Sequence, residues 1–307
     1  MANFDGEKKN SNTSMMRQQT CLCSHRHSTP SNNTMRLDRR SIIMTGVTGS
    51  LLASTSVQAL SVSKPASSSL PFQAYIFDVD GTLSDSFQLG FDATNKVLEK
   101  NGIPTITAEI YHDHTRYATP DRLARHAGFL PGDDAYAATG QALGQEFDDL
   151  YIGLVDIKTS GFFEGIAEKI LEKLPAEVPL GALTNAAERY AHAVLQVNSQ
   201  ALYQSDALYK RFQSIRGADN VPTPKPSPDG LLAVCQDLQV DPAHCVYVGD
   251  SPTDALAAQA AGMAAVGVLW GSHKRSSLEA APFDVLCESV DDLQRALLHG
   301  VPSTQRK

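Results

Sequence analysis

The chain has 307 residues, 42% of them hydrophobic, which is enough for one large domain or two modest ones with a sizeable core. Residues 1–70 carry eight Lys and Arg against three Asp and Glu, a net charge of +5, and because the whole chain carries −8, the remainder carries −13. Such an acidic remainder argues against nucleic acid or an anionic membrane as its main partner. The five cysteines are scattered and do not describe a disulfide framework.

Residues 1–70 are predicted to be a targeting leader and linker, mostly disordered. A basic, hydroxylated stretch leads to Arg39-Arg40, and an uncharged segment over 41–63 ends near the small-residue pattern Val57-Gln58-Ala59. This combination resembles an organelle transit segment followed by a twin-arginine export signal. We therefore expect a plastid (chloroplast) location with the thylakoid lumen as its inner destination; the alternatives are the chloroplast stroma, the bacterial periplasm, or a disordered tail with a chance Arg-Arg pair. The segment is too rich in Ser, Thr and Gly for a transmembrane helix, so no stable membrane anchor is expected.

The folded chain is predicted to start near Phe72, with a short buried strand over 74–77, because that run is apolar, aromatic-rich and bounded by turn residues. Helical spacing follows over 87–101, and Thr119-Pro120-Asp121 is a helix start with Thr as its cap. The region 88–159 shows no clear strand. We therefore predict a helical block inserted after the first strand, forming a cap.

Beyond this block, helices and strands alternate along the chain. This order predicts an α/β fold, with a Rossmann-like, mainly parallel sheet and helices on both faces. The core is predicted to comprise 71–87 and 160–300, with 88–159 as the helical cap. The further helices expected are 134–151, 162–174, 186–197, 228–238, 253–261 and 290–299, and the further strands are 180–184, 214–216, 245–249, 264–269 and 284–287.

Polar residues gather where the predicted strands end, and in an open parallel sheet ligands bind outside those carboxyl ends. Asp78 and Asp80 follow the first strand, and they would share one face if the extended geometry persisted. Each cluster alone has a structural alternative: an acidic turn or calcium loop, a helix cap, or a solvated loop lysine. Their occurrence around one sheet favours a common site. The other clusters are Thr184-Asn185, Lys225 between two prolines, and the acids Asp250 and Asp254.

Together these clusters resemble the four motifs of the haloacid dehalogenase superfamily, and most closely its phosphoglycolate-phosphatase-like members. The resemblance spans Phe72 to about His299 and implies a cap of the C1 type. It implies Asp78 as nucleophile and Asp80 as acid/base, with Mg²⁺ held by Asp78, the backbone carbonyl of Asp80, Asp250 and Asp254. Thr184, Asn185 and Lys225 would then hold the transferring phosphoryl group.

The resemblance implies a Mg²⁺-dependent phosphatase that hydrolyses small phosphate monoesters of metabolites through an aspartyl-phosphate. The physical reasons agree, because phosphoryl transfer needs positioning and charge neutralisation, and Mg²⁺ suits carboxylate and phosphate oxygens. The alternatives are a phosphomutase of the beta-phosphoglucomutase type and a non-catalytic binding protein on the same fold. A dehalogenase is disfavoured, because a displacement at carbon without a metal has no use for so many acids. The physiological substrate and the oligomeric state are left open.

The predicted cap offers basic residues that could select a substrate. Arg116 and Arg122 are candidates to reach a distal anionic group, with an exposed polar surface as the alternative. His112 and His114 resemble a zinc site only loosely, since no third ligand is spaced to join them.

Overall fold

The computed structural model describes residues 70–301, which belong to one compact unit, Ser63–Lys307. The leader on which the targeting prediction rests lies outside the described residues, and two of the five cysteines, Cys21 and Cys23, lie in it. The location therefore stays a prediction. The proposed division into core and cap stays a prediction as well. In the described part of the chain, no helix is both long and apolar enough to cross a membrane.

The core is a six-stranded sheet in the order β3-β2-β1-β4-β5-β6, and every pairing in it is parallel. All residues of β1, β2, β4 and β5 are buried, which is why these strands are short continuous apolar runs in the sequence. The predicted α/β fold is confirmed. The strands are β1 (Ala74–Phe77), β2 (Leu180–Leu183), β3 (Phe212–Arg216), β4 (Cys245–Gly249), β5 (Ala264–Val268) and β6 (Val285–Cys287).

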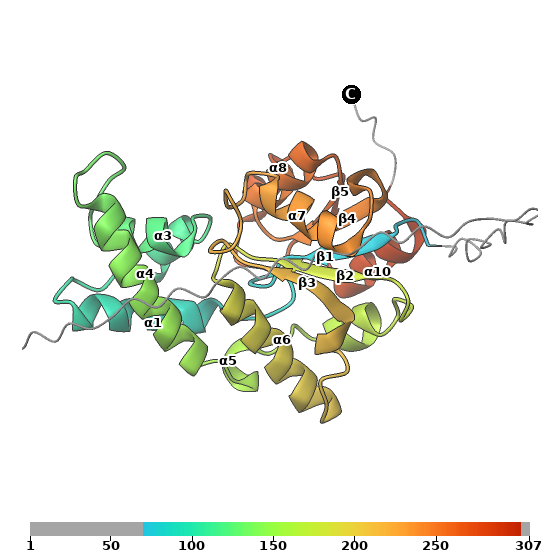
Figure 1. Ribbon diagram of the computed structural model, residues 1–307, viewed down its shortest axis with the longest axis horizontal. Helices are drawn as coiled ribbons and strands as arrows, with labels where there is room; N and C mark the ends of the chain where they lie inside the picture. The colour runs from blue at the N-terminus through green and yellow to red at the C-terminus, as the bar shows by residue number, and fades with distance from the viewer. Residues whose placement is uncertain (1–69, 302–307) are drawn as a thin grey trace, which may run out of the picture. The chain divides into compact units, whose positions relative to one another are not determined.

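Helices cover both faces of the sheet, as predicted. Because side chains alternate along a strand, Tyr75 and Phe77 of β1 enter one hydrophobic cluster, while Ala74 and Ile76 enter the other. The second cluster also contains residues of α7 (Asp229–Leu238) and α8 (Pro252–Ala261), and Figure 1 shows both helices on the same side of the strands. The first cluster holds residues of α6 (Glu188–Tyr203), α10 (Val290–His299) and the helical insertion.

The insertion after β1 is helical, as predicted, and Figure 1 shows α3 and α4 beside the carboxyl ends of the strands. Its two main helices pack closely because α4 presents glycines to α3: a Cβ at Gly140 would lie 2.5 Å from the carbonyl oxygen of Pro120. The insertion comprises α1 (Phe87–Lys100), α2 (Ala108–His114), α3 (Thr119–His126), α4 (Tyr136–Gly153) and α5 (Ile157–Ser160).

Two predicted local features differ from the structure. The residue before α3 that caps it is Ala118, so Thr119 is the first helical residue and its side chain makes no capping hydrogen bond. The expected helix over 162–174 is reduced to η1 (Ile166–Leu171), a π-helical segment. Its start is delayed because Phe163 pairs with the backbone of Leu83 and Gly165 then takes φ +86°. The remaining short helices are η2 (Tyr209–Arg211), η3 (Pro242–His244) and α9 (Arg275–Glu279).

Candidate active site

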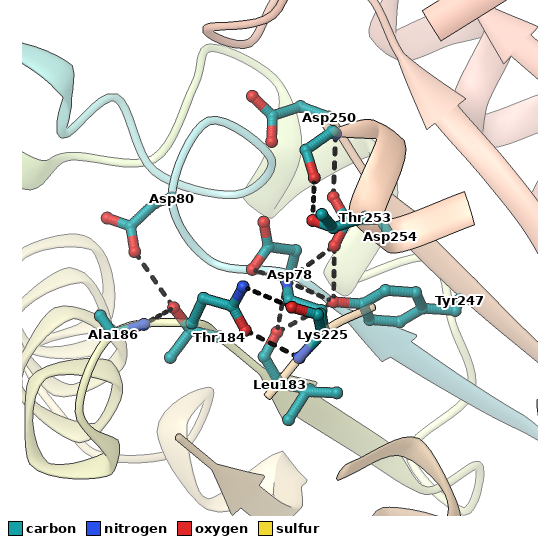
Figure 2. Close-up of polar contacts among 12 residues, drawn as sticks. Asp78, Asp80, Leu183, Thr184, Ala186, Lys225, Tyr247, Asp250, Thr253 and Asp254 are labelled. Atoms are coloured by element: carbon teal, nitrogen blue, oxygen red, sulfur yellow. Dashed lines mark hydrogen bonds and ion pairs between the residues drawn. The ribbon is translucent and has the colours of Figure 1, made fainter. Parts of the chain in front are cut away.

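Three of the polar clusters follow adjacent strands, because β2, β1 and β4 are neighbours in the sheet. Their carboxyl ends therefore meet at one edge, and the loop after β3 adds Lys225 there. Figure 2 shows Asp78, Asp254 and Lys225 pointing toward one another, with Asp250 above them and Asp80 to one side. The convergence expected from the sequence is thus present in the fold.

Lys225 is the centre of the polar cluster. Its Nζ lies 2.9 Å from Asp78 Oδ1 and 2.7 Å from Asp254 Oδ1, and all three side chains are almost fully buried. The ammonium also donates to the hydroxyl of Tyr247, which in turn donates to the carbonyl of Leu183. Burial lowers the pKa of Lys225, but Asp254 and Asp78 outweigh that effect and raise it above its usual value, so the side chain is charged.

Asp78, Asp250 and Asp254 each offer a carboxylate oxygen within 4.8 Å of the others. Burial raises the pKa of Asp78 well above its usual range, and although Lys225 opposes this, the neighbouring acids add to it. Burial and the charge of Asp254 raise the pKa of Asp250 to about 7. A divalent cation would relieve this repulsion, and a compact set of carboxylate oxygens is what Mg²⁺ prefers. The donor set therefore fits Mg²⁺.

Glycine keeps the approach to Asp250 open. A Cβ at Gly81, which has φ +75°, would lie 2.2 Å from Asp250 Oδ2, and a Cβ at Gly271 would lie at the same distance. The same oxygen accepts hydrogen bonds from the backbone N–H of Ser272 (2.8 Å) and from its hydroxyl (3.2 Å). Both loops next to Asp250 must therefore lack side chains at these positions for the carboxylate to reach the cluster.

The carboxylate of Asp80 belongs to a different cluster from that of Asp78. The strand ends at Phe77, so the extended geometry does not persist and the two acids do not share their surroundings. Oδ1 of Asp80 accepts hydrogen bonds from Ser86 (2.5 Å) and Tyr190 (2.6 Å). Among the described residues, the cluster of potential metal-binding side chains does not include Asp80, so only its backbone carbonyl remains as a candidate ligand.

Thr184 and Asn185 lie between these two clusters. Thr184 donates to Asp80 Oδ2 at 3.2 Å and accepts from the N–H of Ala186 at 3.0 Å, so it does not cap α6. The Asn185 amide bonds the backbone of Lys225 in both directions, donating to its carbonyl at 3.1 Å and accepting from its N–H at 3.1 Å. Asn185 thereby ties the end of β2 to the loop that carries the lysine.

A cavity of about 320 Å³ lies over these residues, between the strand ends and the insertion. Arg122 of α3 lines it and is buried, whereas Arg116 is exposed and is not among the lining residues. The guanidinium of Arg122 donates to the hydroxyl of Thr94 at 3.0 Å and lies over the rings of Tyr111 and Phe147. Of the two arginines predicted to meet the substrate, Arg122 therefore lies at the cavity and Arg116 does not.

The two histidines of α2 point to different neighbours. His112 lines the cavity and bonds the carbonyl of Ser272, whose N–H binds Asp250. His114 stacks on His126 with ring centroids 5.0 Å apart. Within the described ranges, the cluster of potential metal-binding side chains contains no histidine.

The sequence did not single out Tyr247, Tyr190 or Tyr151, although the hydroxyls of all three reach the polar clusters. Tyr247 lies inside a buried strand and Tyr190 on the apolar side of a helix, where an aromatic residue is expected in any core. Only the contact of distant elements reveals their polar partners. No local signal could have found them.

A family model described as haloacid dehalogenase-like hydrolase matches residues 75–268. This match covers more than half of the chain, so the chain belongs to that family of enzymes. The phosphoglycolate phosphatase of Xanthomonas campestris is 34% identical over 200 residues, covering 65% of this chain and 84% of that protein. The phosphoglycolate phosphatase of Escherichia coli K12 is 28% identical over 246 residues, covering 75% of this chain and 94% of that protein.

Solved structures share the fold. CbbY from Rhodobacter sphaeroides, in complex with phosphate, has a TM-score of 0.59 and 25% identity over 72% of this chain and 96% of its own. A beta-phosphoglucomutase from Clostridium difficile has a TM-score of 0.56 and 20% identity over 72% of this chain and 93% of its own. A mutase therefore shares the fold of this chain, and the chemistry has to be argued from the site.

Proposed function

We propose that this protein is a Mg²⁺-dependent phosphatase that hydrolyses small phosphate monoesters carrying a second anionic group. The observation that carries this proposal is the buried cluster at the floor of the cavity, where Lys225 lies within 2.9 Å of Asp78 and 2.7 Å of Asp254. A pure binding site for an anion has no use for several carboxylates facing that anion. Several carboxylates are useful where one of them acts as a nucleophile and another binds a cation.

Asp78 is assigned as the nucleophile, and it attacks phosphorus to form an aspartyl-phosphate that water then hydrolyses. Lys225 places a positive charge beside both the nucleophile and the phosphoryl oxygens. When bound to Asp78, Asp250 and Asp254, Mg²⁺ would neutralise charge between two anions that otherwise repel. Asp80 gives a proton to the leaving oxygen and later takes one from water. Thr184 and Asn185 hold the phosphoryl group from the end of β2.

Arg122 is assigned to the distal anionic group of the substrate. Its guanidinium is buried, faces the cavity, and forms no ion pair with any described residue. A buried charge without an oppositely charged partner is costly unless a ligand supplies one. A carboxylate suits the planar guanidinium, so 2-phosphoglycolate, the substrate named for the curated relatives, is the first ester to test.

The nucleophile is tested with Asp78→Asn in a phosphate-release assay with Mg²⁺ over a panel of small esters. The amide removes the attacking oxygen anion while keeping the shape of the side chain, so kcat should fall by at least about 10³-fold. Asp92→Asn, an exposed acid on α1, is the control and should keep full activity. Full activity in Asp78→Asn would contradict the mechanism. Isomerised sugar phosphate without free phosphate would favour the mutase.

The substrate class is tested with Arg122→Gln. Loss of a charge-assisted hydrogen bond should lower kcat/KM about 10- to 100-fold for 2-phosphoglycolate but little for ethyl phosphate, which has no distal charge. The exposed Arg116, changed to Gln, is the matched control and should leave the ratio of the two substrates unchanged. An equal loss for both esters would show that Arg122 supports the fold rather than the substrate.

A further inference from the structure

Two tyrosines from different parts of the fold meet at the carboxylate of Asp80. Tyr190 comes from α6 in the core and Tyr151 from α4 in the helical insertion. Their rings stack with centroids 4.2 Å apart and an interplanar angle of 17°. Both hydroxyls reach the same oxygen of Asp80, at 2.6 Å from Tyr190 and 3.3 Å from Tyr151, and they lie 3.0 Å from each other.

The direction of these hydrogen bonds follows from counting protons. Each phenol hydroxyl has a single proton to donate. The shortest contact assigns the proton of Tyr190 to Asp80 Oδ1, which leaves the Tyr190 oxygen to accept from Tyr151. Ser86 also donates to Oδ1. That oxygen is therefore saturated with donors, whereas Oδ2 faces only the hydroxyl of Thr184, at 3.2 Å.

The geometry points to Tyr190 and Tyr151 as positioning residues that hold Oδ1 of Asp80, so that Oδ2 presents the proton to the leaving oxygen of the substrate. This inference rests on the proposed phosphatase function. In the step concerned, an oxygen of Asp78 forms a bond to phosphorus while the ester P–O bond breaks. The proton on Asp80 Oδ2 goes to the ester oxygen, which departs as an alcohol. Asp80 is left ionised, with the donors to Oδ1 already in place.

The tyrosine pair also ties this step to the insertion. Tyr151 lines the cavity from α4, while Tyr190 lies behind it on α6. The chain of donors to Asp80 is complete only when α4 lies where the structure has it. Tyr151 acts mainly through Tyr190, so its loss should matter less than the loss of Tyr190.

The test compares two esters that differ in their need for a proton. An alkyl phosphate such as 2-phosphoglycolate expels a poor leaving group, whereas p-nitrophenyl phosphate expels a stable phenolate without help. Tyr190→Phe should lower kcat/KM at least about tenfold for the alkyl ester and less than about threefold for p-nitrophenyl phosphate. Tyr151→Phe should show the same selectivity with a smaller loss. Adding it to Tyr190→Phe should cost little more, because the two act in series.

Tyr75→Phe is the matched control, since that buried phenol donates to the carbonyl of Leu297 in the core and not to the site. It should lower the melting temperature without changing the ratio of the two esters. Equal losses for both esters in Tyr190→Phe and Tyr151→Phe, or no loss in either, would overturn the positioning role while leaving the phosphatase intact. A wild-type protein that hydrolyses neither ester with Mg²⁺ would instead remove the proposed function itself.

Discussion

Asp254 shows how one side chain can serve both the fold and the site. Its Oδ2 accepts the N–H of Ser251 at 2.9 Å, which caps the start of α8, while its Oδ1 binds Lys225 at 2.7 Å. The sequence left helix cap and metal ligand as alternatives, and the geometry allows both, because a carboxylate has two oxygens with separate acceptor sites. A change at Asp254 would therefore weaken α8 and the charge balance around Lys225 together.

Asp148 is a half-buried acid that the proposed mechanism does not use. It lies on α4 beside Arg122 and Arg189, but Arg189 forms its ion pair with the exposed Asp149, at 2.7 Å. One oxygen of Asp148 is buried and has no hydrogen-bond partner among the described residues. Burial raises the pKa of Asp148 to about 6, and the nearby arginines only partly oppose this. Below about pH 6 the folded protein therefore holds this carboxyl mainly in its neutral form.

Asp148→Asn should stabilise the protein above about pH 6. Because the folded pKa lies above the unfolded one, the wild type loses stability as the pH rises from about 4 to about 6, where only the unfolded chain readily ionises this group. The amide cannot ionise, so the variant should gain about 1 kcal/mol near pH 7.5 and nothing near pH 4. Urea unfolding at both pH values measures this difference. Asp149→Asn, the neighbouring exposed acid, should show no such gain, and an equal gain there would contradict the assignment to burial.

At the scale of elements, the strands and their polar ends could be predicted because both signals are local. β1, β2 and β4 are apolar runs of four or five residues that end directly before the motif residues, and their parallel pairing places those ends together. The π-helical η1 could not be predicted in the same way. Its residues have a helical spacing, but a backbone pairing between Phe163 and Leu83, distant in sequence, decides where the helix begins.

The packing of α3 on α4 could not be predicted from the sequence either, because it depends on where small residues of one helix meet the other. Gly140→Ala should separate these helices, since the new Cβ would lie 2.5 Å from the carbonyl oxygen of Pro120. The expected loss is about 1–3 kcal/mol of the free energy of unfolding, measured by urea denaturation. Because α3 carries Arg122, kcat/KM for 2-phosphoglycolate should fall as well.

Gly153→Ala provides the control in the same helix. A Cβ at that position meets nothing within 4 Å, so the change should be neutral or slightly stabilising. If the two alanine variants were equally stable and equally active, the close approach of α3 and α4 would not explain the glycine at position 140.

At the scale of the whole molecule, the net charge has the same sign as the charge of the proposed substrate. The chain beyond residue 70 carries a formal charge of −13, yet the proposed substrate is an anion. Inside the cavity this repulsion is offset locally, because two positively charged side chains, Lys225 and Arg122, line it. The carboxylates around Lys225 exceed its single charge, so the site favours a divalent cation together with the substrate.

Mg²⁺ should therefore stabilise the folded protein more at high pH than at low pH. Burial and Asp254 raise the pKa of Asp250 from its usual 3.8 to about 7, so without Mg²⁺ the free energy of unfolding should fall as the pH rises through this range, where only the unfolded chain gives up the proton. Mg²⁺ binds the ionised form. At a concentration about 100 times its Kd it should add about 2.7 kcal/mol near pH 8 and much less near pH 5. Thermal unfolding with Mg²⁺ or a chelator at both pH values measures this. In Asp250→Asn most of the Mg²⁺ effect should disappear, and an equal Mg²⁺ effect at both pH values in the wild type would contradict binding through these carboxylates.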